Sequence, residues 1–559
     1  MNNLYDLSSD MGIVQFPMAV IGASAGGLEA FKTFVGNIPT NSELAYILIQ
    51  HLDPEHKSIL AEILSRHTSL PVKMITDRMQ PEKGQIFIVP AGHSLTINHE
   101  GFNLSEIRQG ESSLGIIDTL FRSIAEACKE KTIAVILSGT MSDGCNGIRT
   151  VKENGGMVVI QNPASADYSE MPTNAEATGL ADLILDLEKI PAAINSFASH
   201  SYVSGNLALK NLDDLEQILA MVKVSSGYDF RYYKKNTLIR RILRRMGLKN
   251  LAGMKDYVQI LKENPNEIRL LFKDLLIGVT EFFRDEDVWK KLKEEIFRKL
   301  IKALPLNASV RVWVPGCSTG EEAYSIAIVL AELFAEYNRP YNAQIFATDI
   351  DEIAISSARA GIYPATISDK VSPQRLNMFF ANEDGKFRIN RQIRESVIFA
   401  VQNLICDAPF SDLDFISCRN LLIYFDPDIQ KNIIDLFSFS LRENGYLLLG
   451  SSESVGFKHS SFEANAKKQR IFRMIGNKRG ERHRESLLQG GTFANRSGRR
   501  VKILSHQQNL ESVMHQQLLN KFVPAAVLVN SRGQIVYFHG QTEKYLSLPR
   551  NEPDFDLIT

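Results

Sequence analysis

The segment Arg311–Ser325, RVWVPGCSTGEEAYS, restricts the possible folds more than any other part of the chain. Its apolar residues alternate along a predicted strand that Pro315-Gly316 breaks, and a helical pattern with two acids in its first turn begins after Gly320. This order is typical of the first strand of an open α/β sheet, where a nucleotide-like ligand approaches the turn. The acids suit the positive helix end but would repel a phosphate, so the turn favours a cationic ligand.

Two later strands are predicted to carry polar groups to the same sheet edge. The strand Gln344–Thr348 ends at Asp349, which places a carboxylate where ribose hydroxyls would lie. The strand from Asp414 ends at Arg419-Asn420. Together these segments predict a crevice for an adenosyl ligand. The alternative is an ordinary doubly wound domain with acids in its loops.

Four motifs in order, LLIGVTEFFRD, GCSTGEEAYSIA, ATDID and SCRNLLIYF, resemble the CheR family of S-adenosylmethionine-dependent methyltransferases, which methylate glutamates of chemotaxis receptors. The resemblance covers about residues 205 to 475 and implies S-adenosylmethionine as the cofactor. It implies that the cofactor site includes Thr280, Arg284, Glu322 at the methionyl amino group, Asp349 at the ribose, Asn403 and Leu404 at the adenine, and Arg419 and Asn420 at the catalytic edge.

Gly278, Thr280, Arg284 and Tyr424 carry further predictions about the cofactor site and the acceptor beside it. Thr280 and Arg284 are expected one helical turn apart, facing one pocket. Gly278 stands where the family commonly has asparagine. By the resemblance Tyr424 lies near the transferred methyl and, with Arg284 and Arg419, positions the incoming glutamate, although a core aromatic is the alternative for Tyr424. Because that carboxylate is ionised at pH 7, the reaction needs alignment and desolvation rather than a strong base.

The first part of the chain carries three polar residues that each follow a predicted strand. Ser24 lies in the turn GASAGG, His51 follows the strand Ala45–Gln50, and Asp143 follows the strand Thr132–Leu137. The ends of parallel strands meet at one edge, so these residues form a possible nucleophile, base and orienting carboxylate, with N–H groups near Thr140, Met141 or the Ser24 helix for the oxyanion. A degenerate dinucleotide fingerprint and simple helix caps are the alternatives.

The motifs GASAGG, QHLDP, VPAGH, LSGTMSDG and NPASADYSEMPTNAEATG are similar to the catalytic domain of CheB, the receptor methylesterase and glutamine deamidase. The family's catalytic triad falls on Ser24, His51 and Asp143. Ala25 stands where threonine is common, and Thr140-Met141 replaces a more usual Met-Gly. CheB proteins usually carry a receiver domain first, and the residues before Phe16 are too few to hold one.

A basic segment stands out in the helical part of the chain. Arg231–Asn250 contains no acid, and Arg240, Arg241, Arg244 and Arg245 would lie along one broad helix face. We expect this face to dock an acidic receptor helix, as the basic N-terminal helix of CheR does by resemblance. A solvated charged face is the alternative.

Length and composition predict several domains in a soluble protein. The chain has 559 residues with a net charge of −1, so overall charge indicates no nucleic-acid partner. Its five cysteines form no CxxC pair, which predicts a reducing, cytoplasmic location and no metal site. No signal peptide or membrane-spanning segment is evident.

The predicted fold is α/β, with a doubly wound parallel-sheet hydrolase domain, a helical subdomain, a Rossmann-like methyltransferase domain and a partial α+β C-terminus that resembles the start of a PAS domain. The predicted boundaries are 16–200, 206–290, 291–475, a linker at 476–512, and 513–559. The expected function is methylation of receptor glutamates and hydrolysis of the esters, with receptors or other acidic helical signalling proteins as partners and no membrane insertion. A receptor-binding scaffold and an enzyme for other substrates are the rival hypotheses.

Overall fold

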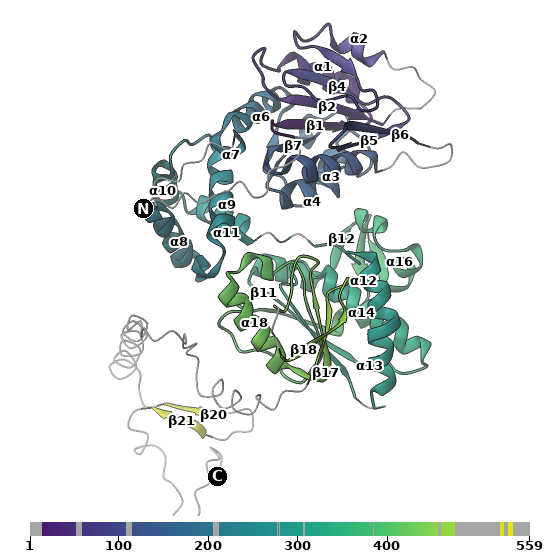
Figure 1. Cartoon of the computed structure of the whole chain (residues 1–559), viewed down its shortest axis with the longest axis vertical. Coiled ribbons are helices and arrows are strands. Elements are labelled where there is room, and N and C mark those ends of the chain that lie inside the picture. The colour runs from purple at the N-terminus through teal and green to yellow at the C-terminus, as the bar shows by residue number, and fades with distance from the viewer. Residues whose placement is uncertain are drawn as a thin grey trace, which may run out of the picture. The chain divides into compact units, whose positions relative to one another are not determined.

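The computed structural model describes residues 14–51, 59–107, 115–204, 212–276, 278, 280–305, 308–383, 385–456, 460–475, 526–529 and 535–539 (Figure 1). The chain divides into two compact units, Met1–Arg484 and Glu485–Thr559. All three predicted α/β and helical segments lie in the first unit. None of the described helices is long and apolar enough to cross a membrane.

The N-terminal part is built on a seven-stranded parallel sheet with strand order β3-β4-β2-β1-β7-β8-β9. Its strands are β1 (Met18–Ala23), β2 (Ala45–Gln50), β3 (Val72–Met74), β4 (Gln85–Ile88), β7 (Thr132–Ile136), β8 (Met157–Gln161) and β9 (Leu183–Leu185), and β5 (His93–Asn98) and β6 (Gly101–Glu106) form a separate hairpin. Its helices are α1 (Gly27–Gly36), α2 (Leu60–Leu64), α3 (Ile116–Cys128), α4 (Gly147–Glu153), α5 (Glu170–Ala177), α6 (Ile190–Ser199) and α7 (Ser201–Ser204).

Both faces of this sheet are buried, which explains why its strands are continuous apolar runs. Along β1, Ala19 and Ile21 pack into one apolar cluster, and Met18 and Val20 pack into another. Side chains alternate between the faces of a strand, so helices must cover both sides. The prediction of a doubly wound parallel sheet is therefore confirmed.

A helical segment follows, with α8 (Leu212–Ser226), α9 (Lys235–Leu248), α10 (Met254–Glu263) and α11 (Pro265–Leu276). Part of the segment between the predicted domain boundaries at 200 and 206 is folded. Helix α7 continues the fold to Ser204, Tyr202 and Val203 are buried, and the Tyr202 hydroxyl donates to the Gly155 carbonyl at 3.0 Å. The apolar side chains bury surface that a solvated linker would leave in water.

The third part contains a mixed seven-stranded sheet with the order β15-β11-β10-β16-β17-β19-β18. Its strands are β10 (Val310–Pro315), β11 (Ala343–Asp349), β15 (Val397–Val401), β16 (Leu413–Cys418), β17 (Leu441–Leu449), β18 (Phe462–Ala466) and β19 (Ile471–Met474). The first five strands in this order, β15, β11, β10, β16 and β17, are parallel. Strands β19 and β18 extend the sheet at one edge in antiparallel pairing. The helices are α12 (Glu286–Lys291), α13 (Arg298–Ala303), α14 (Glu321–Glu336), α15 (Glu352–Ala360), α16 (Pro373–Phe379), α17 (Arg391–Glu395) and α18 (Pro427–Ser440), with a π-helical turn at Leu292–Phe297.

The opening strand, turn and helix of this sheet are confirmed as β10, the Pro315–Gly320 turn and α14. Trp313 on β10 is fully buried, and its indole N–H donates to Thr348 Oγ1 at 3.0 Å, so the ring is packed without leaving its polar atom unpaired. The strands β12 (Ile362–Pro364), β14 (Lys386–Ile389) and β13 (Phe380–Glu383) form a small inserted antiparallel sheet.

In the second unit, β20 (Ala526–Val529) and β21 (Ile535–His539) pair antiparallel. The predicted linker 476–512 and the rest of the PAS-like segment lie outside the described residues.

Candidate active sites

The predicted nucleophile, Ser24, lies in a turn that two glycines make possible. Gly26 adopts φ 74° at the start of α1, a backbone conformation that favours glycine. A Cβ on Gly139 would lie 2.9 Å from Ser24 Cβ and 3.0 Å from its backbone nitrogen. The Ser24 N–H donates to the Ser138 carbonyl at 3.1 Å, so the β1 turn is fastened to the turn that follows β7.

The predicted base and orienting carboxylate form a hydrogen bond. His51 Nε2 lies 2.8 Å from Asp143 Oδ2, and the side chains are 14% and 1% exposed. The His51 N–H donates to the carbonyl of Ala23 at 3.3 Å, which holds the histidine next to the residue before Ser24. The structure therefore brings the ends of β1, β2 and β7 together, as the strand-end argument predicts.

The N-terminus of α3 holds the Asp143 carboxylate. The backbone N–H groups of Ile117 and Asp118 donate to its oxygens at 3.0 and 2.9 Å, and Gly144 N–H donates at 2.8 Å. Burial would raise the pKa of Asp143, but the hydrogen bonds from His51 and these N–H groups outweigh burial and hold the pKa below its usual value. Asp143 is thus kept ionised beside the imidazole.

A second carboxylate, Asp118, lies beside Asp143. Its Oδ1 accepts the N–H of Gly147 at 2.5 Å, which ties α3 to the start of α4. Burial, together with the charge of Asp143, raises the pKa of Asp118 to about 7. The sequence did not indicate that Asp118 would lie at this site, because an acid in the first turn of a helix usually only interacts with the helix dipole.

The loop expected to bind the oxyanion has a strained residue. Met141 adopts φ 70° and is 52% exposed, and its carbonyl accepts Asn174 Nδ2 at 2.8 Å. Thr140 and Met141 therefore belong to a held turn beside Ser24 rather than to a free loop.

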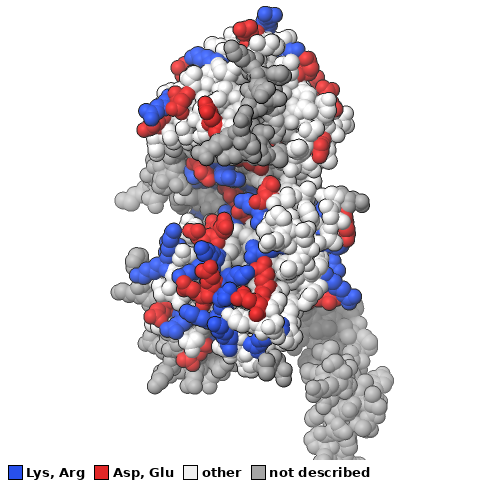
Figure 2. Space-filling model, turned by 90° about the vertical axis from the view of Figure 1, so that its right-hand side faces the viewer, with Lys and Arg blue, Asp and Glu red and all other residues white. Residues whose placement is uncertain are grey.

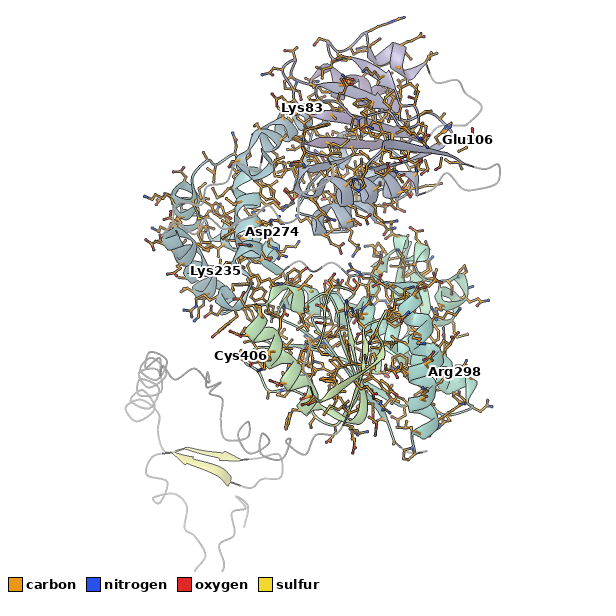
Figure 3. The ribbon with its side chains drawn as sticks, in the orientation of Figure 1. Lys83, Glu106, Lys235, Asp274, Arg298 and Cys406 are labelled. Atoms are coloured by element: carbon orange, nitrogen blue, oxygen red, sulfur yellow. The ribbon has the colours of Figure 1, made fainter. Side chains whose placement is uncertain are left out.

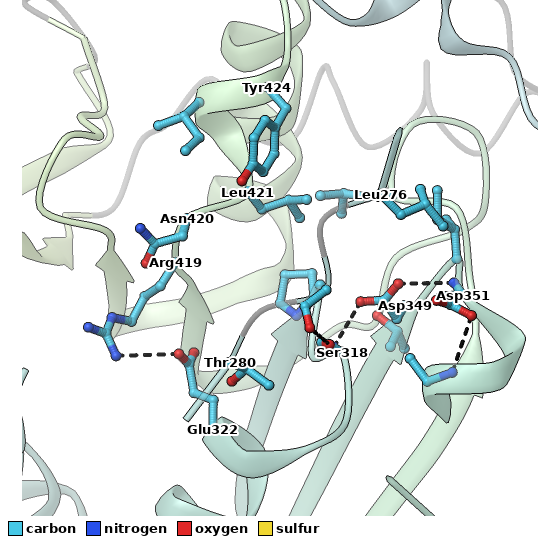
Figure 4. A pocket seen from close by; sticks show the side chains of 18 of the residues that line it. Leu276, Thr280, Ser318, Glu322, Asp349, Asp351, Arg419, Asn420, Leu421 and Tyr424 are labelled. Carbon is cyan, nitrogen blue, oxygen red and sulfur yellow. Dashed lines mark hydrogen bonds and ion pairs between the residues drawn. The ribbon is translucent and has the colours of Figure 1, made fainter. Parts of the chain in front are cut away.

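The second site is a cavity of about 300 Å³ at the carboxyl ends of β10, β11 and β16 (Figure 4). That volume lies at the lower end of the range for small-molecule sites. The pocket brings together all the predicted cofactor residues and the predicted acceptor-side tyrosine, namely Thr280, Arg284, Glu322, Asp349, Asn403, Leu404, Arg419, Asn420 and Tyr424. It also includes Tyr233 of the helical part, which lies outside the four motifs, and Leu276, which lies within LLIGVTEFFRD but was given no role.

Arg419 and Glu322 form a paired charge at the floor of the pocket (Figure 4). Arg419 is 2% exposed in its side chain, pairs with Asp285 and lies 3.4 Å from Glu322 Oε2, while Ser417 Oγ donates to Glu322 Oε1 at 2.7 Å. The Nε of Arg419 is a buried donor without a partner among the described residues. Such a donor is costly unless a ligand satisfies it.

Asp349 is held in place by backbone groups at the end of β11. Its oxygens accept the N–H of Ser318 at 2.8 Å and the N–H of Asp351 at 3.0 Å. Burial raises the pKa of Asp349 despite these bonds. A carboxylate has about four acceptor positions, so it retains capacity for hydroxyl donors of a ligand.

The segment around Thr280 differs from the prediction. Thr280 and Arg284 do not lie one helical turn apart, because α11 ends at Leu276 and Phe283 and Asp285 take positive φ values of 50° and 64°. Both side chains nevertheless line the pocket. At Gly278 the backbone supplies a polar contact, since its carbonyl accepts Ser318 Oγ at 3.0 Å.

Glu453, which sequence reasoning missed, supports the Arg419-Asn420 turn. Its carboxylate accepts backbone N–H groups of Asn420 at 3.1 Å, Leu422 at 2.7 Å and Gly450 at 2.6 Å, and the residue is 4% exposed. Burial raises its pKa, and these N–H groups oppose the rise. The local sequence Ser451–Ser454, in which Glu453 lies, gives no indication of this contact with a distant segment.

The expectation that four arginines of α9 form an exposed dock is wrong for three of them. Arg241, Arg244 and Arg245 are 8%, 4% and 8% exposed, and only Arg240 is half-buried. Arg245 Nη2 binds both oxygens of buried Glu267, at 2.7 and 2.8 Å. On the face shown in Figure 2, basic and acidic side chains are interspersed.

The other two buried arginines have equally specific partners. Arg244 pairs with Asp182 and donates to the Gly156 carbonyl at 2.8 Å and to Asp274 (labelled in Figure 3) at 3.2 Å. Arg241 donates to the carbonyl of Asp274 at 3.0 Å and lies 5.0 Å from the centre of the Tyr424 ring. A buried guanidinium is stable only when it is paired, so these side chains are structural.

The two folds and their sites define a chain in which a serine-hydrolase type of α/β domain precedes a methyltransferase type of α/β domain. The family model for CheB methylesterase matches residues 19–194, that for the CheR methyltransferase all-alpha domain matches 213–276, and that for the CheR methyltransferase SAM binding domain matches 278–472.

Three relatives illustrate these matches. The chain is 32% identical over 254 residues to a chemotaxis protein methyltransferase of Borreliella burgdorferi, which covers 44% of this chain and 88% of that protein. It is 30% identical to the CheB methylesterase catalytic domain of Thermotoga maritima, over 32% of this chain and 98% of that one, with a TM-score of 0.31. It is 32% identical over 441 residues to an uncharacterized 104.1 kDa protein of Rhodobacter capsulatus, covering 74% of this chain.

The chain belongs to the CheB methylesterase family through residues 19–194 and to the CheR methyltransferase family through residues 213–276 and 278–472. It spans 46% of the length of the Rhodobacter capsulatus relative.

Proposed function

We propose that this chain methylates glutamate side chains of chemotaxis-type receptors and also hydrolyses the resulting glutamate methyl esters. It would also deamidate receptor glutamines. Family membership supports both chemistries. The observation that carries the proposal is the convergence of Glu322, Asp349 and Arg419 on one pocket, together with the His51–Asp143 bond at the other sheet. We propose domains at 16–200, 206–290 and 291–475 for these activities.

The hydrolytic site supports a nucleophilic mechanism. Asp143 accepts the Nε2 proton of His51, which leaves Nδ1 as the nitrogen that removes the Ser24 proton. Ser24 Oγ then attacks the ester carbonyl, methanol leaves with the proton from His51, and water hydrolyses the acyl-enzyme by the same groups. Backbone N–H groups of the Met141 turn would stabilise the oxyanion.

The residues of the second pocket fit S-adenosylmethionine. The group carries a cationic sulfonium and amino group, ribose hydroxyls and an adenine, and the pocket offers the carboxylates Glu322 and Asp349 and the apolar Leu276 and Leu404. Arg419 lines the pocket and would hold the methionyl carboxylate. When bound, the sulfonium supplies an electrophilic methyl group.

This chain's own residues would align the acceptor rather than activate it. Arg284 and Tyr424 line the pocket and would hold the glutamate carboxylate, which is ionised without a base. Arg241 behind the Tyr424 ring fixes the orientation of that ring. Glu453 holds the backbone of the Arg419-Asn420 turn and so fixes the floor of the pocket.

Calorimetric titration of S-adenosylmethionine tests the transferase half. We expect one site in the full chain and at least tenfold weaker binding in Asp349→Ala, because a ribose hydrogen bond to a charged group contributes about 1.5–3 kcal/mol. Release of methanol from a methylated receptor fragment tests the hydrolase half, with Ser24→Ala as the inactive variant. Absence of both S-adenosylmethionine binding and methanol release would favour a receptor-binding scaffold.

A further inference from the structure

One carboxylate of the methylesterase part lies in the methyltransferase pocket. Glu153 and Asn154, at the end of α4, are among the residues that line it. Glu153 Oε1 is 3.4 Å from Arg284 Nη1, and both side chains are 28% exposed. Tyr424 lines the same pocket as Glu153.

Several contacts hold α4 in this position. Arg149 donates to the carbonyl of Thr280. Lys152 pairs with Asp182 and lies 3.8 Å from Asp274. Just after the helix, the Gly156 carbonyl accepts Arg244 Nη2 at 2.8 Å. The side chain of Glu153 is thus presented to the pocket by an anchored element.

The same helix begins at the methylesterase site. Gly147, its first residue, donates its N–H to Asp118, whose own N–H binds the triad residue Asp143. Helix α4 has seven residues and so is about 10 Å long, since each residue advances an α-helix by 1.5 Å. One short rigid element therefore connects the surroundings of both candidate sites.

We propose that Glu153 occupies the acceptor position of the methyltransferase pocket as an internal carboxylate that competes with the receptor glutamate for Arg284. This inference rests on the proposed function of the pocket. Glu153 has the same functional group as the acceptor, and Arg284 is the pocket guanidinium that would hold the acceptor. A receptor glutamate must displace Glu153 before it can be methylated, which makes the methylesterase part a restraint on the opposing reaction.

The competition has a defined kinetic consequence. Glu153→Gln keeps the size and shape of the side chain but removes its charge. The competitor is displaced in the complex with acceptor, so we expect the KM for the acceptor to fall about three- to fivefold with kcat unchanged, the range expected from loss of one partly exposed ion pair. The affinity for S-adenosylmethionine should not change.

The experiment compares the full chain, Glu153→Gln and the control Glu126→Gln, in which the same charge is removed from an exposed position on α3. Methyl transfer to a purified cytoplasmic receptor fragment gives KM and kcat. Hydrolysis of the methylated fragment, measured for each variant, confirms that the methylesterase part is folded.

A second measurement separates failure of the Glu153 competition from failure of the proposed transferase activity. The unmethylated receptor fragment is titrated into each variant saturated with S-adenosylhomocysteine, and its affinity is measured. No methyl transfer can occur under these conditions. Tighter binding by Glu153→Gln without methyl transfer in any variant would support the competition and refute the proposed transferase activity. Methyl transfer with the same KM and fragment affinity in all three proteins would overturn the competition and leave the transferase activity standing.

Discussion

Replacing Arg244 by methionine tests whether the basic helix is structural. The guanidinium is 5% exposed and binds Asp182, which is 1% exposed, together with the Gly156 carbonyl at 2.8 Å and Asp274 at 3.2 Å. The charge of Arg244, followed by that of Lys152, outweighs burial and lowers the pKa of Asp182. Methionine would leave this carboxylate buried and only partly paired, at a cost of about 3–5 kcal/mol.

Scanning calorimetry of the full chain measures the effect. For cooperative unfolding of the first unit, Met1–Arg484, the entropy of unfolding is about 1 kcal/mol/K, so the loss corresponds to a fall of about 3–5 °C in Tm. Arg240→Met on the same helix is the matched control and should change stability by less than about 0.5 kcal/mol, because Arg240 is half-buried. Adding Asp182→Asn to Arg244→Met should recover part of the loss. Equal Tm values for the Arg244 and Arg240 variants would refute the structural role and restore the exposed-dock hypothesis.

Three further predictions concern the sites themselves. The pKa of Asp118 is raised to about 7 in the folded protein, so at this residue the folded state binds more protons than the unfolded state between about pH 4 and pH 7, and the stabilising contribution of Asp118 falls as pH rises through that interval. Asp118→Asn should therefore shift the plot of Tm against pH toward a rising slope in that interval, and an unchanged slope would contradict the assignment. Glu453→Gln places an amide N–H₂ against backbone donors, so calorimetry should show S-adenosylmethionine binding about tenfold weaker, with normal ester hydrolysis as the control. Gly139→Ala puts a methyl group 2.9 Å from Ser24 Cβ, so methanol release should fall at least tenfold while S-adenosylmethionine binding is retained; undiminished hydrolysis would show that the turn can move.

Short-range patterns in the sequence predicted the strands and turns on which both sites are built. Apolar alternation defined β10 and its neighbours, glycines marked the turns after β1 and β10, and the residues that follow each strand were placed correctly at the sheet edges. These features depend on local steric rules and on the fixed geometry of parallel strands, so residues near one another in the chain are enough to specify them.

Contacts between distant segments could not be predicted in this way. Arg244 pairs with Asp182, 62 residues earlier, and a helical wheel that shows Arg244 on a basic face cannot show that this face is covered. Glu453 reaches back about 30 residues to the turn that it holds. In each case the local sequence predicts a charged side chain, but the identity of its partner depends on packing.

The sequence by itself determined the two α/β folds, the position of Ser24, His51 and Asp143 after predicted strands, and the adenosyl-type crevice, because each follows from local periodicity, turn chemistry and motif order. Only the tertiary structure decided that Arg244 and Arg245 of α9 are buried in ion pairs, that Thr280 and Arg284 meet the pocket from an irregular segment, and that Glu153 lines it. The physical reason is that burial and charge pairing are set by which surfaces come together in space, and spacing along one segment does not contain that information.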